Sequence, residues 1–291
     1  MKHRGLLFIL LSVACFGSAS IFARFAYDAG INLVTMLTVR FGISAALLFI
    51  YSTFARESLR LAPKDLKLVL LLGAVGYGIM AYLYFGSLQY IPVSMATLIT
   101  YTYPTIVTVM AYFILKEPLS QHKLLCLAMA SIGCALMVWA PGLKINLTGA
   151  ALAFGSSVIY SIYIIYTSQH AGHLPPRTLT FYIVLGAFAV YLVIGTLTRG
   201  FIWNLPWQAW AATASLAVIP TVLGNIFFFT GLRHMGATKT ALVSTVEPIY
   251  VVLMAMAIFN ERITLIQGGG GLLIIAAVVL LQLRGDNAIN T

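Results

Sequence analysis

The sequence contains few charged residues and little cysteine. Asp, Glu, Lys and Arg together make up 8% of the 291 residues, whereas hydrophobic residues make up 61%. Soluble domains carry roughly a quarter charged residues, so this composition excludes a chain that is mainly soluble. The three cysteines, Cys15, Cys126 and Cys134, each lie inside an apolar run. Their odd number and lack of paired spacing argue against a disulfide framework and against a metal site.

Acidic residues are scarcer than basic ones, with 7 Asp and Glu against 17 Lys and Arg and a net charge of +10. An excess of positive charge can indicate nucleic-acid binding. Here, however, Lys and Arg lie mostly in short connections between apolar segments. We therefore expect no nucleic-acid partner and attribute the charge to the orientation of the chain in a membrane.

Long apolar runs are what the sequence has in abundance. A helix of about 20 apolar residues crosses a hydrocarbon core of about 30 Å, and such runs recur along the whole chain. The connections between them are short, so consecutive helices should pack as neighbours. We expect an all-α integral membrane protein with ten transmembrane helices. They are predicted at residues 5–27, 33–54, 67–89, 94–115, 120–140, 148–168, 178–198, 208–232, 237–259 and 264–283.

The distribution of Lys and Arg predicts how the chain is oriented. With alternate connections on alternate sides, twelve basic residues fall on the side of the N-terminus and three on the other. Lys and Arg are enriched in cytoplasmic loops. Both termini are therefore expected in the cytoplasm, in a protein integral to the plasma (inner) membrane.

The two halves of the sequence resemble each other without a gap. The segment YPTIVTVMAYFILKEPLS, from Tyr103, aligns with EPIYVVLMAMAIFNERIT, from Glu247, at a separation of 144 residues. Five spans in each half place the second half in the membrane with the opposite direction. We therefore predict two inverted five-helix repeats, residues 1–143 and 144–291. Many secondary transporters share this architecture, with a substrate site near the midplane between the repeats.

The motifs at these positions resemble a known family. KEPLS and NERIT close the fourth and ninth spans, EP lies inside the ninth, and the whole resembles the EamA-like group of the drug/metabolite transporter superfamily. The resemblance implies export or exchange of small organic solutes, most often amino acids and related metabolites, with drugs also suggested. One departure is Phe16, before Gly17, where such proteins often have tryptophan.

Glu247 is an acidic residue inside an apolar run, near the middle of the ninth span. A carboxylate exposed to lipid there would cost several kcal/mol, so it should face the bundle interior and either pair or bind a proton. One interpretation makes Glu247 a substrate counter-ion or protonation site. The other is structural, because Pro248 lacks an N–H and leaves a helical carbonyl without its usual donor.

Other prolines and glycines are candidate points of flexibility. Pro104 occupies the position equivalent to Pro248, and Pro220 in the eighth span is equivalent to Gly76 in the third. These four residues could serve as kinks or gates. The segment around Gly76 is rich in small residues, so close packing of helices is the alternative.

Two arginines, Arg24 and Arg40, lie in the outer thirds of the first two spans. They could extend to the outer surface, with Asp28 as a partner. Alternatively, a guanidinium could bind a substrate carboxylate in a bidentate geometry, and Arg40 is the better candidate for this role.

Tyrosines gather in the third, fourth and sixth spans. Inward-facing tyrosines suit an amphipathic cavity that binds an organic solute, although each could equally be a packing residue. The predicted substrate-binding set, besides Glu247 and Arg40, is Tyr82, Tyr101, Tyr103, Tyr160, Tyr163 and Asn225.

These observations favour a secondary transporter of small organic metabolites that works by alternating access, and the family resemblance implies amino acids or related compounds as the cargo. The alternatives are a transporter of organic cations or drugs and a lipid-carrier flippase. Paired carboxylates and an H-E-x-x-H motif are missing from the sequence, so we expect no enzyme, no cofactor and no bound metal. The expected partners are a small-molecule solute and the lipid bilayer, and a monomer is one of the allowed states.

Overall fold

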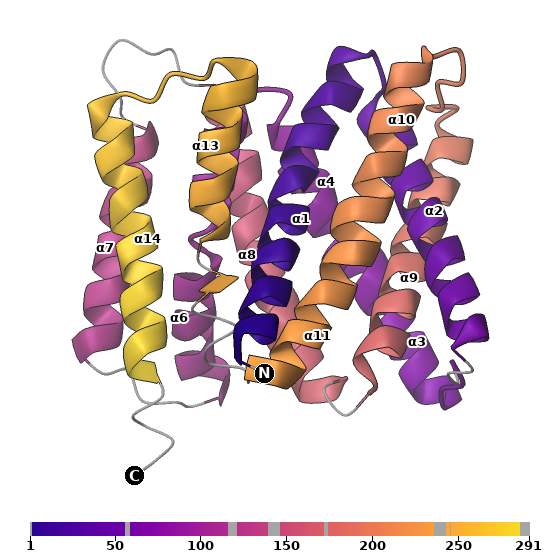
Figure 1. Cartoon of the computed structure of the whole chain (residues 1–291), viewed down its shortest axis with the longest axis horizontal. Coiled ribbons are helices and arrows are strands. Elements are labelled where there is room, and N and C mark those ends of the chain that lie inside the picture. The colour runs from indigo at the N-terminus through magenta and orange to yellow at the C-terminus, as the bar shows by residue number, and fades with distance from the viewer. Residues whose placement is uncertain are drawn as a thin grey trace.

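The computed structural model of the chain is a bundle of helices (Figure 1). The structure describes residues 2–55, 59–115, 121–138, 146–171, 174–235, 243–244 and 246–285. These residues contain helices, turns and short connections and no strand. The all-helical prediction is therefore confirmed for the described part of the chain.

The helices follow one another with short connections, as expected. The first half contains α1 (Lys2–Asp28), α2 (Leu33–Phe54), α3 (Pro63–Leu71), η1 (Leu72–Tyr77), α4 (Gly78–Ser87), α5 (Val93–Thr100), α6 (Tyr103–Leu115) and α7 (Gln121–Val138). The second half contains α8 (Leu147–His170), α9 (Pro176–Leu197), α10 (Trp207–Leu216), η2 (Ala217–Leu223), α11 (Gly224–Met235), α13 (Glu247–Phe259) and α14 (Leu265–Gly285).

Seven helical segments of the described chain are long and apolar enough to cross a membrane. Three shorter apolar helices lie at Leu124–Gly133, Glu247–Phe259 and Leu265–Leu280. Each of them overlaps one predicted span, and the predicted span 33–54 coincides with α2. In lipid, helices satisfy every backbone hydrogen bond within one segment, which is why this apolar sequence folds almost entirely as helix.

The predicted spans 94–115 and 237–259 are not continuous helices. The first is divided by a turn at Tyr101 and Thr102, and α6 begins at Tyr103. The second has a turn at Val246, and α13 begins at Glu247. The two breaks therefore occupy positions separated by 144 residues. Both breaks lie beside prolines that the sequence marks as candidate kinks. Pro104 and Pro248 cannot donate a backbone hydrogen bond inside a helix and instead fit the first turn of α6 and of α13.

The third and eighth predicted spans each contain a π-helical segment, η1 and η2. A π-helix is rare, and its backbone hydrogen bonds join residues five positions apart instead of four. Such segments often occur at functional sites. Side chains from neighbouring helices bond to carbonyls at these segments. The Tyr191 hydroxyl donates to the Gly78 carbonyl at 2.7 Å, and Ser44 donates to the Ala217 carbonyl at 3.2 Å.

The two halves of the chain are interleaved. The most extensive contacts join α7 to α14, α1 to α11, α2 to α9 and α4 to α8, and each pair combines one helix from each half. Figure 1 shows α7 beside α14 at one edge of the bundle. A Cβ added to Gly73 would overlap the Ile183 carbonyl, so these backbones approach closely. Small residues permit this kind of packing in membranes.

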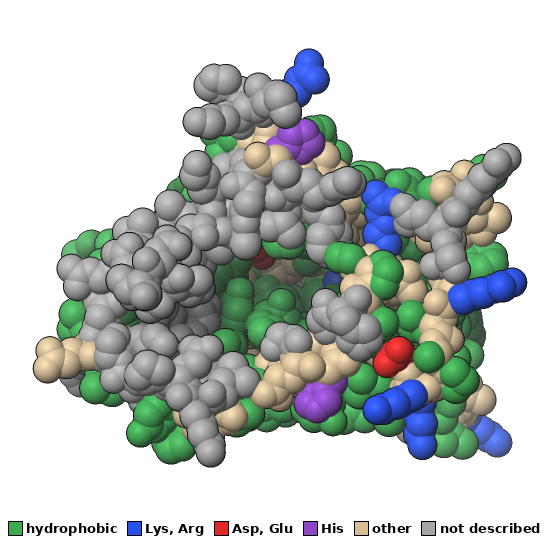
Figure 2. All heavy atoms as spheres, turned by 90° about the horizontal axis from the view of Figure 1, so that it is seen from below, with side chains coloured by type: hydrophobic (Ala, Val, Ile, Leu, Met, Phe, Trp, Pro, Cys, Tyr) green, Lys and Arg blue, Asp and Glu red, His purple; other side chains and the backbone are tan. Residues whose placement is uncertain are grey.

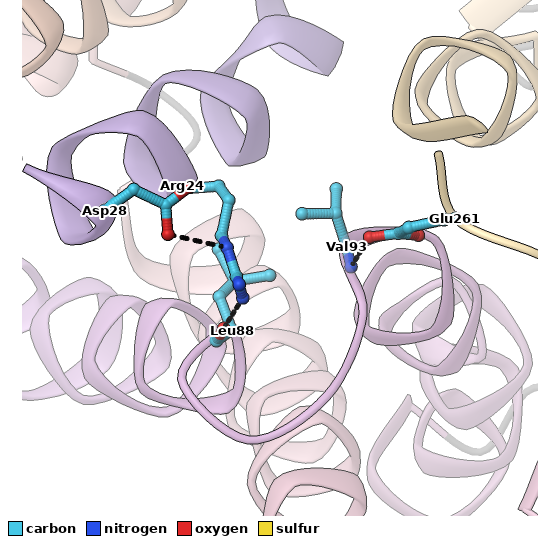
Figure 3. A network of polar contacts seen from close by, with 5 residues as sticks. All are labelled: Arg24, Asp28, Leu88, Val93 and Glu261. Carbon is cyan, nitrogen blue, oxygen red and sulfur yellow. Dashed lines mark hydrogen bonds and ion pairs between the residues drawn. The ribbon is translucent and has the colours of Figure 1, made fainter. Parts of the chain in front are cut away.

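Polar contacts connect helices at the end of the bundle where α1 ends (Figure 3). Arg24 Nε lies 3.2 Å from the Asp28 carboxylate, and its Nη1 donates to the Leu88 carbonyl at 3.3 Å. The expected ion pair between Arg24 and Asp28 is thus confirmed. Nearby, the Glu261 carboxylate accepts from the Val93 backbone N–H at 2.7 Å and from the Ser94 N–H at 3.1 Å. Glu261 therefore caps α5 and ties it to the connection before α14.

Candidate functional site

A cavity of about 550 Å³ lies in the middle of the bundle, with walls from both halves of the chain. Most of its surface is apolar or aromatic, and polar groups are placed at a few points. Figure 2 shows the end of the bundle at which α1 begins, and this face is hollowed at its centre. A mostly apolar pocket with a few converging polar groups is the usual form of a small-molecule site.

The cavity wall repeats itself at the separation seen in the sequence. Seven pairs of wall residues lie 144 positions apart, one member of each pair in each half. Several pairs join unlike side chains, so equivalent positions contribute different chemistry. The pairs are Phe16 and Tyr160, Ala19 and Tyr163, Arg40 and Val184, Tyr77 and Thr221, Tyr84 and Phe228, Thr100 and Ser244, and Tyr103 and Glu247.

Glu247 carries the acidic side chain among the described wall residues. It begins α13 immediately after the turn at Val246, where the positive end of the helix dipole favours a carboxylate. The Tyr101 hydroxyl lies near this carboxylate, and Tyr103 and Tyr160 lie within electrostatic range of it. The break in the ninth span thus places a carboxylate at the cavity wall instead of along a lipid-facing helix.

Five tyrosine rings form a continuous belt along the wall. Successive ring centroids from Tyr101 to Tyr103, Tyr160, Tyr163 and Tyr77 lie 5.9, 4.9, 6.0 and 6.0 Å apart. These separations fall in the range of favourable aromatic pairs. The belt begins beside Glu247 and ends beside Arg40, and it offers ring faces and hydroxyls to a solute between them.

Arg40 carries the basic side chain among the described wall residues, and it is 5% exposed. Its Nε donates to the Thr221 hydroxyl at 3.3 Å. The guanidinium carbon lies 4.7 Å from the centre of the Phe85 ring and 5.1 Å from that of Phe41. Arg40 is therefore held in the core of the bundle, and the expectation that it extends to the outer surface was wrong.

The structure brings most of the predicted substrate-binding residues together. Glu247, Arg40, Tyr101, Tyr103, Tyr160, Tyr163 and Asn225 all line the cavity. Tyr82 does not, and it is 47% exposed. Its neighbours Met80 and Tyr84 do line the wall. A step of two residues along a helix turns the side chain by about 200°, which directs Tyr82 away from the face shared by these neighbours.

The predicted kink positions lie at or beside the cavity. Pro220 lies inside η2 and lines the wall. Gly76 lies in η1, where an added Cβ would come within 2.8 Å of the Tyr163 ring. Pro248 lies in the first turn of α13, a position that suits a residue without an N–H. The structural interpretation of Glu247 stays a prediction. Pro104 lies in the first turn of α6, and its side chain is outside the described residues.

Sequence reasoning missed several small hydroxyl residues of the wall, namely Thr97, Thr100, Thr180, Ser20 and Ser244. Thr97 donates to or accepts from the Tyr84 hydroxyl at 3.2 Å. A usable signal existed, since Thr97 and Thr100 share helical spacing with Tyr101 and Tyr103 in one span. Among the described residues, no group of three His, Cys, Asp or Glu side chains is placed to hold a metal ion.

Comparison with known proteins identifies the family. The model of the EamA-like transporter family matches the chain twice, at residues 3–139 and 147–283. The chain belongs to the EamA-like transporter family. The two matches span nearly the whole chain, and the start of the second lies 144 residues after the start of the first. The protein is accordingly an integral membrane transporter of this family and not an enzyme.

Curated relatives of this transporter are similar over most of its length. The uncharacterized transporter YyaM of Bacillus subtilis is 26% identical over 89% of this chain and 87% of its own. The threonine/homoserine exporter RhtA of Escherichia coli K12 is 26% identical over 86% of this chain and 81% of its own. A solved crystal structure that is 17% identical superposes with a TM-score of 0.69 over 99% of both chains, which supports the fold.

Proposed function

We propose that this EamA-like protein is a secondary exporter or exchanger of small organic metabolites. Amino acids and related compounds are the proposed substrate class. One observation carries the proposal: seven pairs of residues, 144 positions apart and with one member in each half, line a central cavity. A substrate site built from equivalent positions of two repeats is the arrangement that alternating-access transporters use.

We place the chain in the plasma (inner) membrane as ten spans in two inverted five-helix repeats, residues 1–143 and 144–291. Seven long apolar helices and three shorter ones support this count. The bias of Lys and Arg supports cytoplasmic termini. With that orientation, the hollow face of Figure 2 is cytoplasmic, and the Glu261 contacts close the opposite end.

In the proposed mechanism the solute enters from the cytoplasm. Glu247 binds the cationic amine of the solute or a proton, and the tyrosine belt contacts the body of the solute. Rocking of one repeat against the other then closes the cytoplasmic side and opens the outer side. The turns before Tyr103 and Glu247 lie at equivalent positions, where the two halves could bend by similar motions.

An organic cation or drug is the second candidate cargo. The observation that favours it is a carboxylate beside aromatic rings, because cations bind to carboxylates and to the faces of tyrosine. A lipid-carrier flippase is the third candidate.

A counterflow experiment with purified protein in liposomes tests the proposal. Liposomes are loaded with an unlabelled compound, and uptake of the same labelled compound is followed. The panel contains the proteinogenic amino acids, L-homoserine, organic cations such as tetraphenylphosphonium, and a fluorescent lipid for flipping. Empty liposomes and Glu247→Gln protein are the controls.

We expect saturable exchange of one or more amino acids in liposomes that contain the native protein. Exchange of organic cations alone would establish the second candidate, and lipid flipping alone the third. A transport function would be contradicted if the protein stays monodisperse and binds a compound of the panel but exchanges none of them.

A further inference from the structure

Arg40 is a buried cation whose charge is not balanced within the described structure. It is 5% exposed, and no carboxylate of the described residues pairs with it. Its neighbours Thr221 and Tyr77 are neutral, as are the two phenylalanine rings that it faces. A buried charge without an opposite charge is unfavourable, so such residues usually serve a ligand or a pathway.

One nitrogen of this guanidinium also lacks a hydrogen-bond partner. Within the described residues, Nη1 of Arg40 is buried and bonds to no acceptor. Buried donors are nearly always satisfied by protein, water or ligand. Because Arg40 lines the cavity, an anion bound there could accept from Nη1. A carboxylate fits this donor set best, since a guanidinium binds carboxylates through two parallel hydrogen bonds.

We propose that Arg40 forms an anion subsite of the cavity and binds the carboxylate of the transported solute. This inference rests on the proposed transport function and narrows its substrate class. A solute held by Arg40 carries a free carboxylate, which excludes simple organic cations as the main cargo.

The position of Arg40 relative to Glu247 supports a single ligand that contacts both. Tyr84, Glu247 and Arg40 line the same cavity, and Tyr84 lies within electrostatic range of both charges. The tyrosine belt joins the same two regions along the wall. A small dipolar solute with an amine toward Glu247 and a carboxylate toward Arg40 matches this arrangement.

The repeat makes this charge pattern directional. The residue equivalent to Arg40 is Val184, and the residue equivalent to Glu247 is Tyr103. All four line the cavity. Each half therefore contributes one charge of opposite sign, so a dipolar solute would bind in one orientation.

The inference is tested with chemically matched ligands on the native protein. Thermal stability of the purified protein is titrated with each amino acid that exchanges, with its methyl ester and with its decarboxylated amine, because a ligand that binds the folded state raises stability. Sodium chloride and sodium acetate are titrated separately to detect a free inorganic or simple anion. We expect the apparent affinity of the ester and of the amine to be about tenfold or more below that of the amino acid.

Two variants locate the effect. Arg40→Lys retains the charge and loses the bidentate geometry. It should lower the apparent affinity for the amino acid more than the apparent affinity for the methyl ester. Arg24→Gln is the matched control, since Arg24 is already paired with Asp28, and it should preserve the difference between acid and ester. If Arg40→Lys does not fold, the comparison of acid, ester and amine on the native protein still decides the inference.

The outcomes separate this inference from the proposed function. Exchange of solutes with equal affinity for acid and ester, or with amines bound best, would overturn the role of Arg40 and leave transport intact. Stabilisation by chloride or acetate that does not compete with the amino acid would also overturn it, because the subsite would then hold a separate ion. Failure of every carboxylate to bind or exchange would overturn the inference together with amino-acid transport.

Discussion

The two halves of the cavity wall occupy equivalent positions but present different chemistry. The first half supplies Arg40 and Tyr103, whereas the second supplies Val184 and Glu247 at the same places. Symmetric sequence positions provide two similar surfaces that can move against each other. Asymmetric side chains give the cavity between them a fixed polarity. The comparison teaches that equivalent positions of the two halves line the site together, and that a few departures from the repeat account for its polarity.

The largest effect is expected from removing the charge that distinguishes Glu247 from Tyr103. Glu247→Gln keeps the size of the side chain but loses the charge-assisted contact. Such contacts contribute about 1.5–3 kcal/mol, so we expect exchange to fall by about tenfold or more. The measurement is counterflow in liposomes at equal protein content.

Tyr103→Phe is the matched change in the first half. It removes one hydroxyl from the belt and leaves the ring, so we expect a smaller loss of exchange than with Glu247→Gln. Equal losses in the two variants, or unchanged exchange in Glu247→Gln, would remove the special role of the carboxylate.

A second comparison concerns packing at equivalent positions. Gly73 lies where a Cβ would overlap the Ile183 carbonyl, whereas Ala217, 144 residues later, is buried with its methyl group in place. Overpacking costs about 1–3 kcal/mol, so Gly73→Ala should lower the thermal midpoint of the purified protein clearly. Ala217→Gly should cost about 1 kcal/mol or less.

Gly269→Ala is the control for this pair, because a Cβ there meets nothing within 4 Å. Its thermal midpoint should equal or slightly exceed that of the native protein, because Ala favours a helix more than Gly does. A tolerated Gly73→Ala would show that η1 and α9 do not pack as closely as described.

The Glu261 cap of α5 should have an intermediate effect. Glu261→Gln weakens hydrogen bonds from the first N–H groups of α5 and from the Ser94 hydroxyl, and it removes a charge from the helix N-terminus. Losing a cap of this kind costs about 0.5–2 kcal/mol. We expect a lower thermal midpoint of the purified protein. The substitution Arg262→Gln at an exposed neighbour should leave the thermal midpoint unchanged, and equal behaviour of the two variants would argue against the cap.

The smallest effect is expected from Arg24→Gln. The Arg24 and Asp28 side chains are 40% and 53% exposed, and pairs of this kind contribute about 1 kcal/mol or less. Stability and exchange should both stay close to native values. A strong loss of exchange would assign Arg24 to the transport path and weaken the contrast with Arg40.

Much of the fold could be predicted because hydrophobic length decides it. The run 33–54 coincides with α2, and the separation of 144 residues located Tyr103 and Glu247 at equivalent places. The π-helical segments were not predicted, because hydrophobic length and periodicity do not distinguish them from an α-helix. Side chains of other helices bond to the carbonyl of Ala217 in η2 and of Gly78 just after η1.

The candidate site was partly predictable for a similar reason. Polar residues in an apolar span must face inward, which identified Glu247 and most tyrosines. Which side of a helix faces the cavity depends on how helices pack, so Tyr82 was placed wrongly. The burial of Arg40 among Thr221, Phe41 and Phe85 also required the structure, since those residues lie on three different elements.

The central claim is that one cavity between the two halves opens alternately to each side of the membrane. The most direct test places a cysteine at Thr100, a small wall residue, in a chain whose three native cysteines are replaced by alanine. Membrane-impermeant thiol reagents are then applied to the cytoplasmic or the outer side of oriented vesicles. The account predicts labelling from both sides, slowed from both by a transported solute. Labelling from one side alone, with or without a transported solute, would contradict alternating access.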